Sequence, residues 1–383
     1  MKKLRIAIYT DIYLPKEHNG GGLETYIDSI RQELRRRGHT VFIVTSGPKI
    51  LREYYKDDKE IIVLPGRRIY RPYPYFGLYT GIFKADPKLV KMKPDVIHIQ
   101  TPFTIGLLAL KVGKNLGINC IATYHGFYTS DMAIESFISR KRLIIKSVQL
   151  LAARYIRWFH SKVKVVISPS NFIKKELNRM GLKNVIVVHE GIDLARFKKG
   201  TSKSKARKLL GIGQRDKVML HLGRVSLEKN LDLFIKAAKE LERYGVKSII
   251  VGAGKDLEHY KKLSRELGIK SIKFAGFVDE DKKVLYYKAA DVFCFPSNFE
   301  TQGLVAVEAM ASGLPVVAPE GTAQAEMIKP GLNGEVFKKD DLKDLLRKIR
   351  KVLSNGSSYA AERSIEDFDI KRHVSKLLKI YMS

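Results

Sequence analysis

Two carboxylates lie eight residues apart in the stretch SNFETQGLVAVEAMASGLPVVAPEG, residues 297–321. Glu300 precedes Gly303, and a glycine lets the backbone approach a ligand closely. The N–H groups that begin a helix suit an anion such as phosphate. Glu308 stands among small apolar residues, which argues against a merely solvated glutamate. Because one carboxylate can accept two hydrogen bonds, Glu308 suits a pair of ribose hydroxyls, and Glu300 suits sugar hydroxyls.

Two cations follow another apolar run in HLGRVSLEKN, which contains Arg224 and Lys229. An arginine fork and a lysine point charge on one loop suit a pyrophosphate. They would also stabilise the charge that develops if the pyrophosphate leaves. In a basic protein such a pair is more often a solvated surface feature, but its place directly after a predicted strand favours the binding interpretation.

Glycines form two further turns. HNGGGLETY places Gly20, Gly21 and Gly22 between a predicted strand and a predicted helix, which suits a phosphate or a close approach to substrate. VGAGKDL contains Gly252 and Gly254. Neither stretch has the G-x-G-x-x-G spacing, so a hydride-transfer dinucleotide site is poorly supported.

Two histidines belong to strand-like stretches. His125, in TYHGFY, directly follows a predicted strand, where a parallel sheet binds its ligands, so a functional role fits it as well as a structural one. His98, in DVIHIQ, lies inside a predicted strand and is expected to be a satisfied core or cleft-wall residue.

Asp279 and Asp281 form an acid-x-acid pair in FVDEDKK. Such a pair can hold a divalent metal near a nucleotide, but acids are also favourable at a helix N-terminus, and we interpret this pair as a helix start. No Cys/His cluster has zinc-site spacing. The expectation is therefore no metal and no cofactor.

The elements that position these residues alternate between strand and helix along the chain. Apolar runs such as LRIAIYT, TVFIVTSG, DVIHIQTP, CIATYHG, VKVVISPS and VIVVHEGI predict buried parallel strands. After a charged stretch near residue 195, a second alternation runs through KVMLHLGRV, SIIVGAG, IKFAGFV, DVFCFPS and LPVVAPE. The pattern predicts an α/β fold of two doubly wound, Rossmann-like parallel-sheet domains that face each other across a cleft.

The predicted domains comprise residues 1–195 and residues 196–365. The tail, about 366–383, is an amphipathic helix that is expected to pack back on the first domain; one side of it carries Val374, Leu377, Leu378 and Tyr381.

Composition agrees with a folded chain. The length of 383 residues allows two or three domains, and 45% hydrophobic and 29% charged residues fit a globular protein. Cys120 and Cys294 lie in apolar runs, which predicts buried free thiols in a reducing compartment. No apolar run is long enough to predict a transmembrane helix. Asp11 interrupts the apolar segment at the start of the chain. We therefore interpret this segment as the first strand of a cytoplasmic protein rather than as a signal peptide.

The net charge of +30 is uneven. Lys and Arg outnumber Asp and Glu by 20 in residues 1–200 and by 10 in the remainder. Such a charge attracts polyanions or anionic membranes, although a solvated Lys/Arg-rich surface is an equally open interpretation. Between Glu135 and Glu176 there is no acidic residue but there are ten basic ones, and for this segment we favour a functional role.

The same segment is basic, apolar and carries the only tryptophan of the chain. A basic amphipathic helix of this kind lies on anionic lipid. The residues predicted to contact a membrane are Arg140, Lys141, Arg142, Lys146, Arg154, Arg157 and Trp158.

Taken together, the motifs resemble the GT-B-fold retaining glycosyltransferases of family 4. The resemblance rests on GGGLE, DVIHIQTP, TYHG, ISPSNF, HEGID, GRVSLEKN, the long stretch from FAGFVDEDKK to SGLPVVA, and GLNGEVF, which occur in this order over nearly the whole chain. ETQG and the TYHGFY region are similar to membrane-associated glycolipid synthases, such as diacylglycerol glucosyltransferases.

The resemblance implies roles for individual residues. Arg224 and Lys229 would bind the donor diphosphate, Glu308 would hold the donor ribose, and His125 would lie by the transferred sugar. Glu300 would hold the donor sugar and phosphate together with backbone groups, and the remaining contacts would come from glycine-rich or loop positions. Beside Glu300, these positions are Gln302, Gly303 and Leu304. The loop from Gly276 to Val278 would contact the nucleotide base of the donor, and Gly21 and Gly22 would line the acceptor side.

The resemblance also implies a mechanism. The mechanism that the family implies is front-face transfer without a metal, with retention of the anomeric configuration. The leaving phosphate helps to deprotonate the acceptor, so we name no enzymatic base. One position departs from the family pattern, because Glu190 precedes Gly191 where the family often has Asn-Gly. The departure puts any asparagine contact there in doubt, but not the fold.

The favoured function is transfer of a hexose from UDP-glucose to a lipid or lipid-linked acceptor, by an enzyme peripheral on the inner face of the cell membrane. GDP-mannose is the second donor, and a GT-B transferase or epimerase acting on a soluble sugar is an alternative. The charge also allows a nucleic-acid-binding protein, but the chain lacks a helix-turn-helix or aromatic stacking motif, so no nucleic-acid partner is expected. Oligomeric state is left open.

Overall fold

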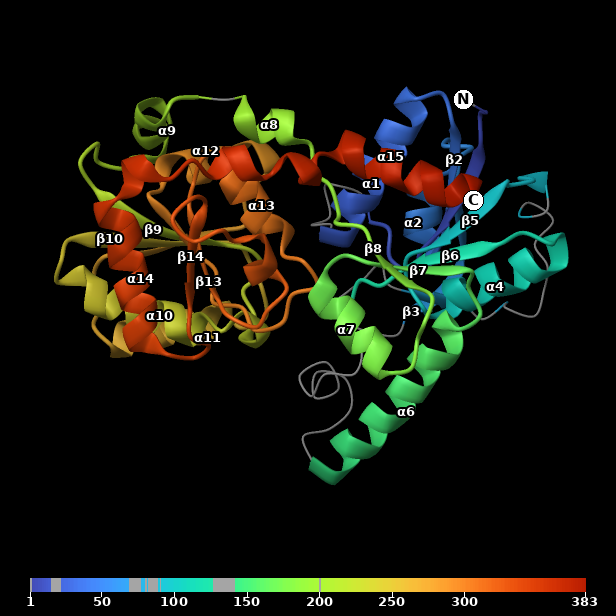
Figure 1. The fold of residues 1–383 in the computed structure, drawn as a ribbon, viewed down its shortest axis with the longest axis horizontal. Coiled ribbons are helices and arrows are strands. Elements are labelled where there is room, and N and C mark those ends of the chain that lie inside the picture. Colours follow the sequence, from blue (N-terminus) through green and yellow to red (C-terminus); the bar gives the residue numbers. More distant parts are fainter. Residues whose placement is uncertain are drawn as a thin grey trace. The chain divides into compact units, whose positions relative to one another are not determined.

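The computed structural model describes residues 2–14, 22–68, 77–79, 81, 89, 91–126, 142–199 and 201–383. The chain forms two compact units, each with its own sheet (Figure 1). Unit 1 comprises Met1–Gly191 and the C-terminal Ile370–Ser383, and unit 2 comprises Ile192–Asp369. The predicted fold class of two doubly wound parallel-sheet domains is confirmed.

The sheet of unit 1 has the strand order β4-β3-β2-β1-β5-β6-β7-β8. All neighbours pair in parallel except β3 and β4, which are antiparallel. The antiparallel edge was not predicted, and its cause is a connection too short for a crossover helix. The strands are β1 (Arg5–Tyr9), β2 (Thr40–Gly47), β3 (Ile61–Arg68), β4 (Gly77–Tyr79), β5 (Val96–Ile99), β6 (Cys120–Thr123), β7 (Val165–Ser168) and β8 (Val185–Val187).

Helices pack on this sheet because successive strand residues point to opposite faces. Ala7 and Tyr9 of β1 lie in a buried cluster with side chains of α4, α6 and α7, whereas Ile6 and Ile8 point to the other face and are also fully buried. The helices of unit 1 are α1 (Gly22–Arg36), α2 (Lys49–Tyr54), α4 (Thr104–Leu116), α6 (Arg142–His160), α7 (Asn171–Arg179) and α15 (Ile370–Met382).

The C-terminal helix α15 lies beside α1, at the other end of the sequence (Figure 1). Its apolar stripe is buried: Val374, Leu377, Leu378 and Tyr381 are each at most 9% exposed. The hydroxyl of Tyr26 on α1 lies 2.9 Å from Nε2 of His373. The last helix is thus built into the N-terminal unit.

The sheet of unit 2 is wholly parallel and has the order β11-β10-β9-β12-β13-β14. Apolar clusters cover both faces: Val218 and Leu220 of β9 belong to one, and Met219 between them belongs to the other. The strands are β9 (Lys217–Leu222), β10 (Val246–Val251), β11 (Ile272–Gly276), β12 (Val292–Cys294), β13 (Val316–Pro319) and β14 (Gly334–Phe337).

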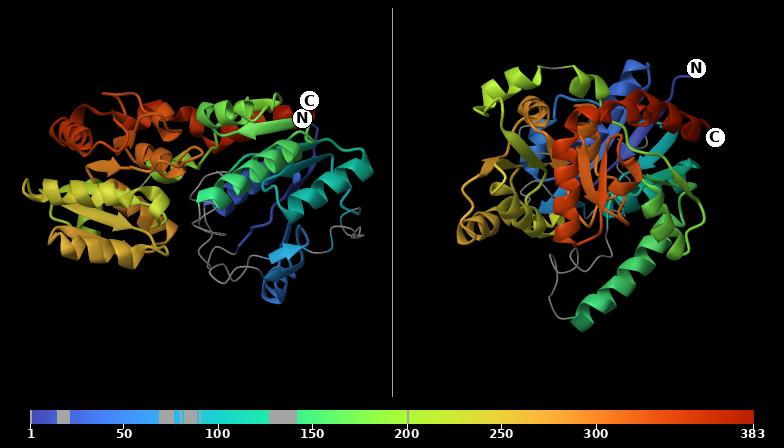
Figure 2. Two further views of the ribbon diagram at one scale, coloured as in Figure 1. Left: turned by 90° about the horizontal axis from the view of Figure 1, so that it is seen from below. Right: turned by 60° about the vertical axis from the view of Figure 1, so that its left-hand side comes forward.

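Helices and short 3-10 turns surround this second sheet (Figure 2). The helices are α8 (Leu194–Lys198), α9 (Lys203–Leu210), α10 (Leu231–Glu242), α11 (Leu257–Glu266), α12 (Glu280–Ala289), α13 (Leu304–Ala311) and α14 (Leu342–Ser354). Among the 3-10 turns, η2 (Leu227–Lys229) follows β9. Cys120 in unit 1 and Cys294 in unit 2 are buried free thiols, as predicted.

Candidate functional site

The carboxyl ends of β9 and β12 bring two predicted site residues together. Lys229 ends η2 after β9, and Glu300 lies in the loop between β12 and α13. Lys229 Nζ lies 2.6 Å from Glu300 Oε1, and the two side chains are only 15% and 13% exposed. Arg224, also after β9, is more exposed, and its Nε lies 3.9 Å from Glu228 Oε1. The loop after β9 thus presents both cations beside a carboxylate.

The start of α13 is shaped by a glycine. Gly303 occupies the helix N-cap position with φ of +89°, a conformation that residues with a side chain rarely adopt. A Cβ atom there would lie 2.8 Å from Cε1 of Phe295. No side chain caps the helix, and Gln302 beside the glycine is buried. The first turn, from Gly303 and Leu304 onward, has the geometry that suits an anion.

The second carboxylate is held from the neighbouring helix α12. Glu308 is 6% exposed; its Oε1 lies 3.0 Å from Lys283 Nζ, and its Oε2 accepts a 2.8 Å hydrogen bond from the hydroxyl of Tyr287. Lys283 also pairs with Glu280 at 2.9 Å. Burial lowers the pKa of Lys283, but the charges of Glu308 and Glu280 outweigh burial, so this pKa is raised. Glu308 therefore faces a charged ammonium group.

The sequence did not single out Lys283 and Tyr287. They lie four residues apart and therefore on one side of α12, a spacing that could have marked them as a pair. Nothing in the sequence indicates that this side meets α13, because the contact joins two separate helices.

The loop after β11 was predicted to contact the base. Gly276 has φ of +69°, and Val278 packs against the apolar cluster of unit 2. Phe277, between them in the same predicted loop, is 57% exposed. An exposed aromatic ring in this loop suits a planar group of a ligand.

The acid-x-acid stretch is a helix start, as interpreted. Asp279 is the N-cap of α12, and its carboxylate accepts a 2.7 Å hydrogen bond from the backbone N–H of Lys282. Asp281 forms a 2.9 Å ion pair with Arg196. Within the described ranges, no three metal-ligating side chains gather at one place.

The VGAG glycines have a packing role. A Cβ atom on Gly252 would lie 1.8 Å from the carbonyl oxygen of Gly223, and one on Gly254 would lie 2.0 Å from that of Val225. The two loops that follow β9 and β10 therefore touch through their backbones, and this explains the glycines without a dinucleotide.

In unit 1, His125 lies between two polar side chains. Its Nδ1 is 2.8 Å from Glu190 Oε1, and its Nε2 is 2.6 Å from Gln100 Oε1. His98 is a fully buried core residue that contacts Tyr381 and Thr123, each at 2.7 Å. Burial lowers the pKa of His98 to about 3, so the core interpretation of His98 is confirmed.

Part of the predicted acceptor side lies outside the described residues, namely Gly20 and Gly21. Gly22 is the first residue of α1 and is exposed. A Cβ atom there would meet nothing within 4 Å, so no contact of the described residues requires a glycine at this position.

The predicted membrane segment forms helix α6. Arg140 and Lys141 lie outside the described residues, and Arg142 begins the helix. The helix extends beyond the rest of unit 1 (Figures 1 and 2). Ile156 and Phe159 near its C-terminal end are buried against the unit.

The outer side of α6 mixes basic and apolar side chains. Lys146, Leu150, Arg154 and Trp158 recur every four residues, so they share one side of the helix, and all four are exposed. Leu150, Leu151 and Trp158 are 62%, 65% and 48% exposed. Arg157 is also exposed. We call Lys146, Leu150, Leu151, Arg154 and Trp158 the α6 stripe. In the described part of the chain, no helix is long and apolar enough to cross a bilayer.

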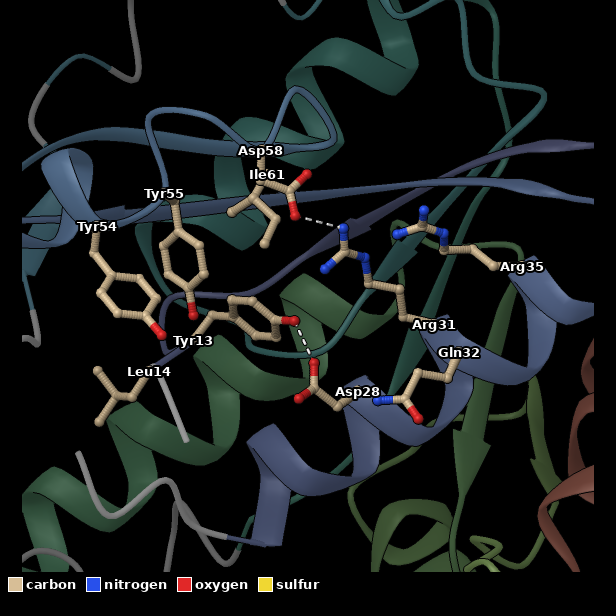
Figure 3. A pocket seen from close by; sticks show the side chains of 10 residues that line it. All are labelled: Tyr13, Leu14, Asp28, Arg31, Gln32, Arg35, Tyr54, Tyr55, Asp58 and Ile61. Carbon is tan, nitrogen blue, oxygen red and sulfur yellow. Dashed lines mark hydrogen bonds and ion pairs between the residues drawn. The ribbon is translucent and has the colours of Figure 1, made fainter. Parts of the chain in front are cut away.

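A separate pocket of unit 1 lies between α1, α2 and the start of β3 (Figure 3). Its charged groups are largely paired with one another: Arg31 contacts Asp58 at 2.9 Å, and the hydroxyl of Tyr13 donates to Asp28. The lining holds none of the described residues that the sequence predicts for the site. It consists of Tyr13, Leu14, Asp28, Arg31, Gln32, Arg35, Tyr54, Tyr55, Asp58 and Ile61.

Two family descriptions match the two halves of the chain. Glycosyltransferase Family 4 matches residues 20–196, and Glycosyl transferases group 1 matches residues 202–366. Among solved structures, the chain is similar to Anabaena HepE in complex with UDP and glucose, with a TM-score of 0.73, 21% identity and coverage of 99% of this chain and 100% of that one. It is also similar to WaaG, a glycosyltransferase involved in lipopolysaccharide biosynthesis, with a TM-score of 0.73, 17% identity and coverage of 99% of this chain and 100% of that one.

Curated relatives are similar over most of the length. The chain is 34% identical over 348 residues to an alpha-monoglucosyldiacylglycerol synthase of Streptococcus pneumoniae. The aligned residues cover 87% of this chain and 75% of that protein. It is 29% identical over 349 residues to the alpha-monoglucosyldiacylglycerol synthase of Acholeplasma laidlawii, with coverage of 88% and 86%. The chain therefore belongs to the GT-B glycosyltransferases of family 4, glycosyl transferases group 1.

Proposed function

We propose that this glycosyltransferase moves glucose from UDP-glucose to a lipid or lipid-linked acceptor at an anionic membrane surface, with retention of configuration and without a metal. The observation that carries the proposal is the gathering of Lys229, Glu300, Gly303 and Glu308 around the first turns of α13. The names of the two glucosyl-lipid synthases to which the chain is similar support glucose and a lipid.

The donor diphosphate binds the cationic loop after β9. An ammonium group has three N–H donors, and Glu300 takes one of those of Lys229. The other two can reach phosphate oxygens, while the exposed fork of Arg224 supplies a bidentate contact. The uncapped start of α13 adds backbone N–H groups with the same preference for negative charge.

The donor ribose binds Glu308. Lys283 and Tyr287 contact one carboxylate oxygen each. An ionised carboxylate can accept about four hydrogen bonds, so about two remain for the vicinal hydroxyls of a ribose. Because its two protein partners come from α12, Glu308 is held in place before the donor arrives.

Transfer breaks the bond between C1 of the sugar and the diphosphate oxygen, and it forms a bond between C1 and the acceptor oxygen. The acceptor proton passes to the leaving phosphate, so the chain need not supply a base. Arg224 and Lys229 stabilise the charge that grows on the diphosphate. We assign His125 of unit 1 a contact with the transferred sugar, as the family resemblance implies.

The α6 stripe supports a lipid acceptor. Exposed leucines and a tryptophan between basic side chains are the composition of a helix that lies in a membrane interface. We place the protein on the inner face of the cell membrane, where anionic lipids attract basic segments at about 1 kcal/mol per Lys or Arg.

A second donor has support of its own. The chain is 27% identical to a GDP-mannose-dependent alpha-(1-6)-phosphatidylinositol dimannoside mannosyltransferase of Mycobacterium tuberculosis, over 85% of this chain and 82% of that protein. GDP-mannose is therefore the alternative donor, with a lipid acceptor in either case.

A donor screen tests the proposal. Purified full-length protein is given UDP-glucose, UDP-galactose, UDP-GlcNAc or GDP-mannose, with and without anionic liposomes that contain diacylglycerol and polyprenyl phosphate. Free nucleotide and lipid-phase sugar are measured in EDTA and in Mg²⁺. We expect UDP-glucose to label the lipid at the same rate in both. Turnover that ignores lipid would support a soluble acceptor. Glu300→Ala removes a carboxylate of the proposed donor site and is expected to lower turnover. Glu266→Ala, at an exposed position of α11 outside that site, is its control and is expected to leave turnover unchanged.

A further inference from the structure

A buried carboxylate stands behind the candidate catalytic histidine. Oε1 of Glu190 lies 2.8 Å from Nδ1 of His125, with side chains 7% and 9% exposed. Glu190 occupies the position where the family pattern often has asparagine. We propose that Glu190 is a positioning residue of this transferase, which acts through His125. The inference rests on the proposed function, because it assigns a part in the same reaction.

Three strand ends build this arrangement. Gln100 directly follows β5, His125 follows β6 by one residue, and Glu190 lies shortly after β8. All three strands run in parallel in one sheet, so their carboxyl ends meet at the same edge. This is the edge at which such sheets bind ligands.

The contacts favour one position of the hydrogen on His125. Glu190 Oε1 lies 2.8 Å from Nδ1, although this oxygen makes no hydrogen bond to the described residues. Because an ionised carboxylate can only accept, a hydrogen on Nδ1 is the form that suits this contact. Nε2 then faces the side-chain amide of Gln100 at 2.6 Å. Gln100 is fully buried, and its amide nitrogen has no hydrogen-bond partner among the described residues. With the amide turned by 180°, this nitrogen would donate to Nε2 of the neutral Nδ1–H tautomer.

A purely structural role does not explain the charge. The neighbouring His373 is also buried, and its Nδ1 is 2.7 Å from the backbone carbonyl oxygen of His189, a neutral partner. A neutral oxygen thus suffices to satisfy a buried ring N–H here. Burying a carboxylate costs several kcal/mol of desolvation, so the negative charge of Glu190 does more than hold the ring. Nδ1 of His125 lies 2.8 Å from its carboxylate, whereas Nε2 of His259 lies 3.9 Å from Oδ1 of Asp232.

The charge of Glu190 acts on the ring nitrogen that it faces. It selects the tautomer and the ring orientation of His125, as in other carboxylate–histidine pairs. The groups that face the ring are Gln100, Glu190, and Tyr26 of α1, whose ring centroid lies 5.2 Å away. His98 and His373 are the other titratable histidines close enough to interact with it.

A double-mutant cycle on the full chain tests the inference. Carboxylates that orient metal-ligating histidines typically contribute about 10- to 100-fold. By analogy, Glu190→Ala is expected to lower kcat by a similar factor while the donor KM changes less than about 3-fold. In a His125→Gln background, Glu190→Ala is expected to have almost no further effect on kcat. Glu190→Gln, which keeps an acceptor without the charge, is expected to lie between the wild type and Glu190→Ala.

A matched variant separates stability from positioning. Glu33→Gln removes a carboxylate of unit 1 that is equally buried but pairs with Arg36 and Arg37 on α1. It is expected to lower Tm and leave kcat unchanged. Equal losses from Glu190→Ala in both backgrounds would overturn the inference, as would a loss of Tm with no loss of kcat.

A second readout keeps the inference testable if no donor is turned over, which would be a failure of the proposed function alone. In ¹⁵N-labelled protein, the His125 resonances are assigned by their absence in His125→Gln. Nδ1 of the wild type is expected to carry hydrogen, and in Glu190→Ala the more usual Nε2–H form is expected to appear. A wild-type Nδ1 without hydrogen would contradict the role of Glu190.

Discussion

The start of α13 and the α6 stripe use charge in opposite ways. In the first, the carboxylates are largely shielded from solvent, with side chains 13% exposed for Glu300 and 8% for Glu308, and each meets a lysine: Glu300 with Lys229, and Glu308 with Lys283. In the second, lysine and arginine stand exposed between exposed apolar side chains such as Leu150. The difference predicts what a mutation will change. Loss of a shielded ion pair should lower both stability and activity, whereas loss of an exposed side chain should lower function without lowering stability.

The largest effect is expected at Glu308. Glu308→Ala leaves the ammonium of Lys283 buried beside only Glu280, and breaking a buried pair in this way costs about 3–5 kcal/mol of unfolding free energy. Urea denaturation followed by circular dichroism measures the loss. The double variant Glu308→Ala/Lys283→Met, which removes both charges, should recover most of it, and a Glu308→Ala protein as stable as the wild type would contradict the contrast.

Arg224 sharpens the contrast, because it serves the same site from an exposed position. Arg224→Ala removes a contact to the leaving diphosphate and is expected to lower kcat by about 10²- to 10³-fold, the cost of losing one charge-stabilising donor. Tm should stay within about 2 °C. Arg224→Lys keeps the charge without the fork and should fall between. Steady-state kinetics with saturating acceptor decide the matter; a fall in Tm as large as that of Glu308→Ala would show that the arginine is structural.

A fall in pH is expected to destabilise unit 1 more than unit 2. Burial lowers the pKa of His98 to about 3 and that of His160 and His373 to about 4 in unit 1, whereas in unit 2 only His221 among the described residues is lowered in this way, to about 4. Unfolded histidine has a pKa near 6.5, so the unfolded chain binds more protons and stability falls as pH drops from about 6.5 towards 4. Each histidine contributes about 1–2 kcal/mol between pH 7 and 5.

Amide hydrogen exchange, read separately for the two units at pH 7 and pH 5 and corrected for the intrinsic rate, measures this difference. Unit 1 is expected to lose more protection than unit 2. Equal losses would mean that carboxylates, rather than these buried histidines, dominate the acid response.

The smallest effects per residue are expected on α6. Leu150→Ser and Trp158→Ser should each weaken binding to anionic liposomes by about 1 kcal/mol, roughly 5-fold, because each removes an exposed apolar contact with the interface. Neither should change Tm. Liposome flotation at low salt measures binding. Leu209→Ser on α9 is the matched control, because Leu209 is 61% exposed and Leu150 is 62% exposed. If the three variants bind equally, the stripe is an ordinary solvated surface.

Much of the candidate site in unit 2 could be predicted from the sequence, because the signals for it are local. Asp279 caps the helix that follows it, and the glycine at 303 takes the left-handed conformation that only glycine adopts readily. The eight-residue spacing also places Glu300 in a loop and Glu308 more than one turn inside α13. Each of these features depends on residues a few positions apart, which a sequence displays directly.

Features that depend on contacts between distant segments of the chain could not be predicted from the sequence. Lys283 and Tyr287 reach Glu308 only because α12 packs beside α13. Glu190 appeared as a departure from a motif, yet its contact with His125 spans 65 positions of the chain and follows from the order of the parallel strands. Strand β4 is three residues long, too short for a period to be visible.

The most direct test of the central claim is the lipid product itself. Wild-type protein is incubated with UDP-glucose and liposomes that contain diacylglycerol, either with an anionic lipid or with zwitterionic lipid only, and the organic phase is examined by NMR of the anomeric proton. We predict an α-linked glucosyl lipid that forms much faster on the anionic liposomes. A β-linked product would contradict retention, and glucose transfer that is independent of any lipid would contradict the membrane function.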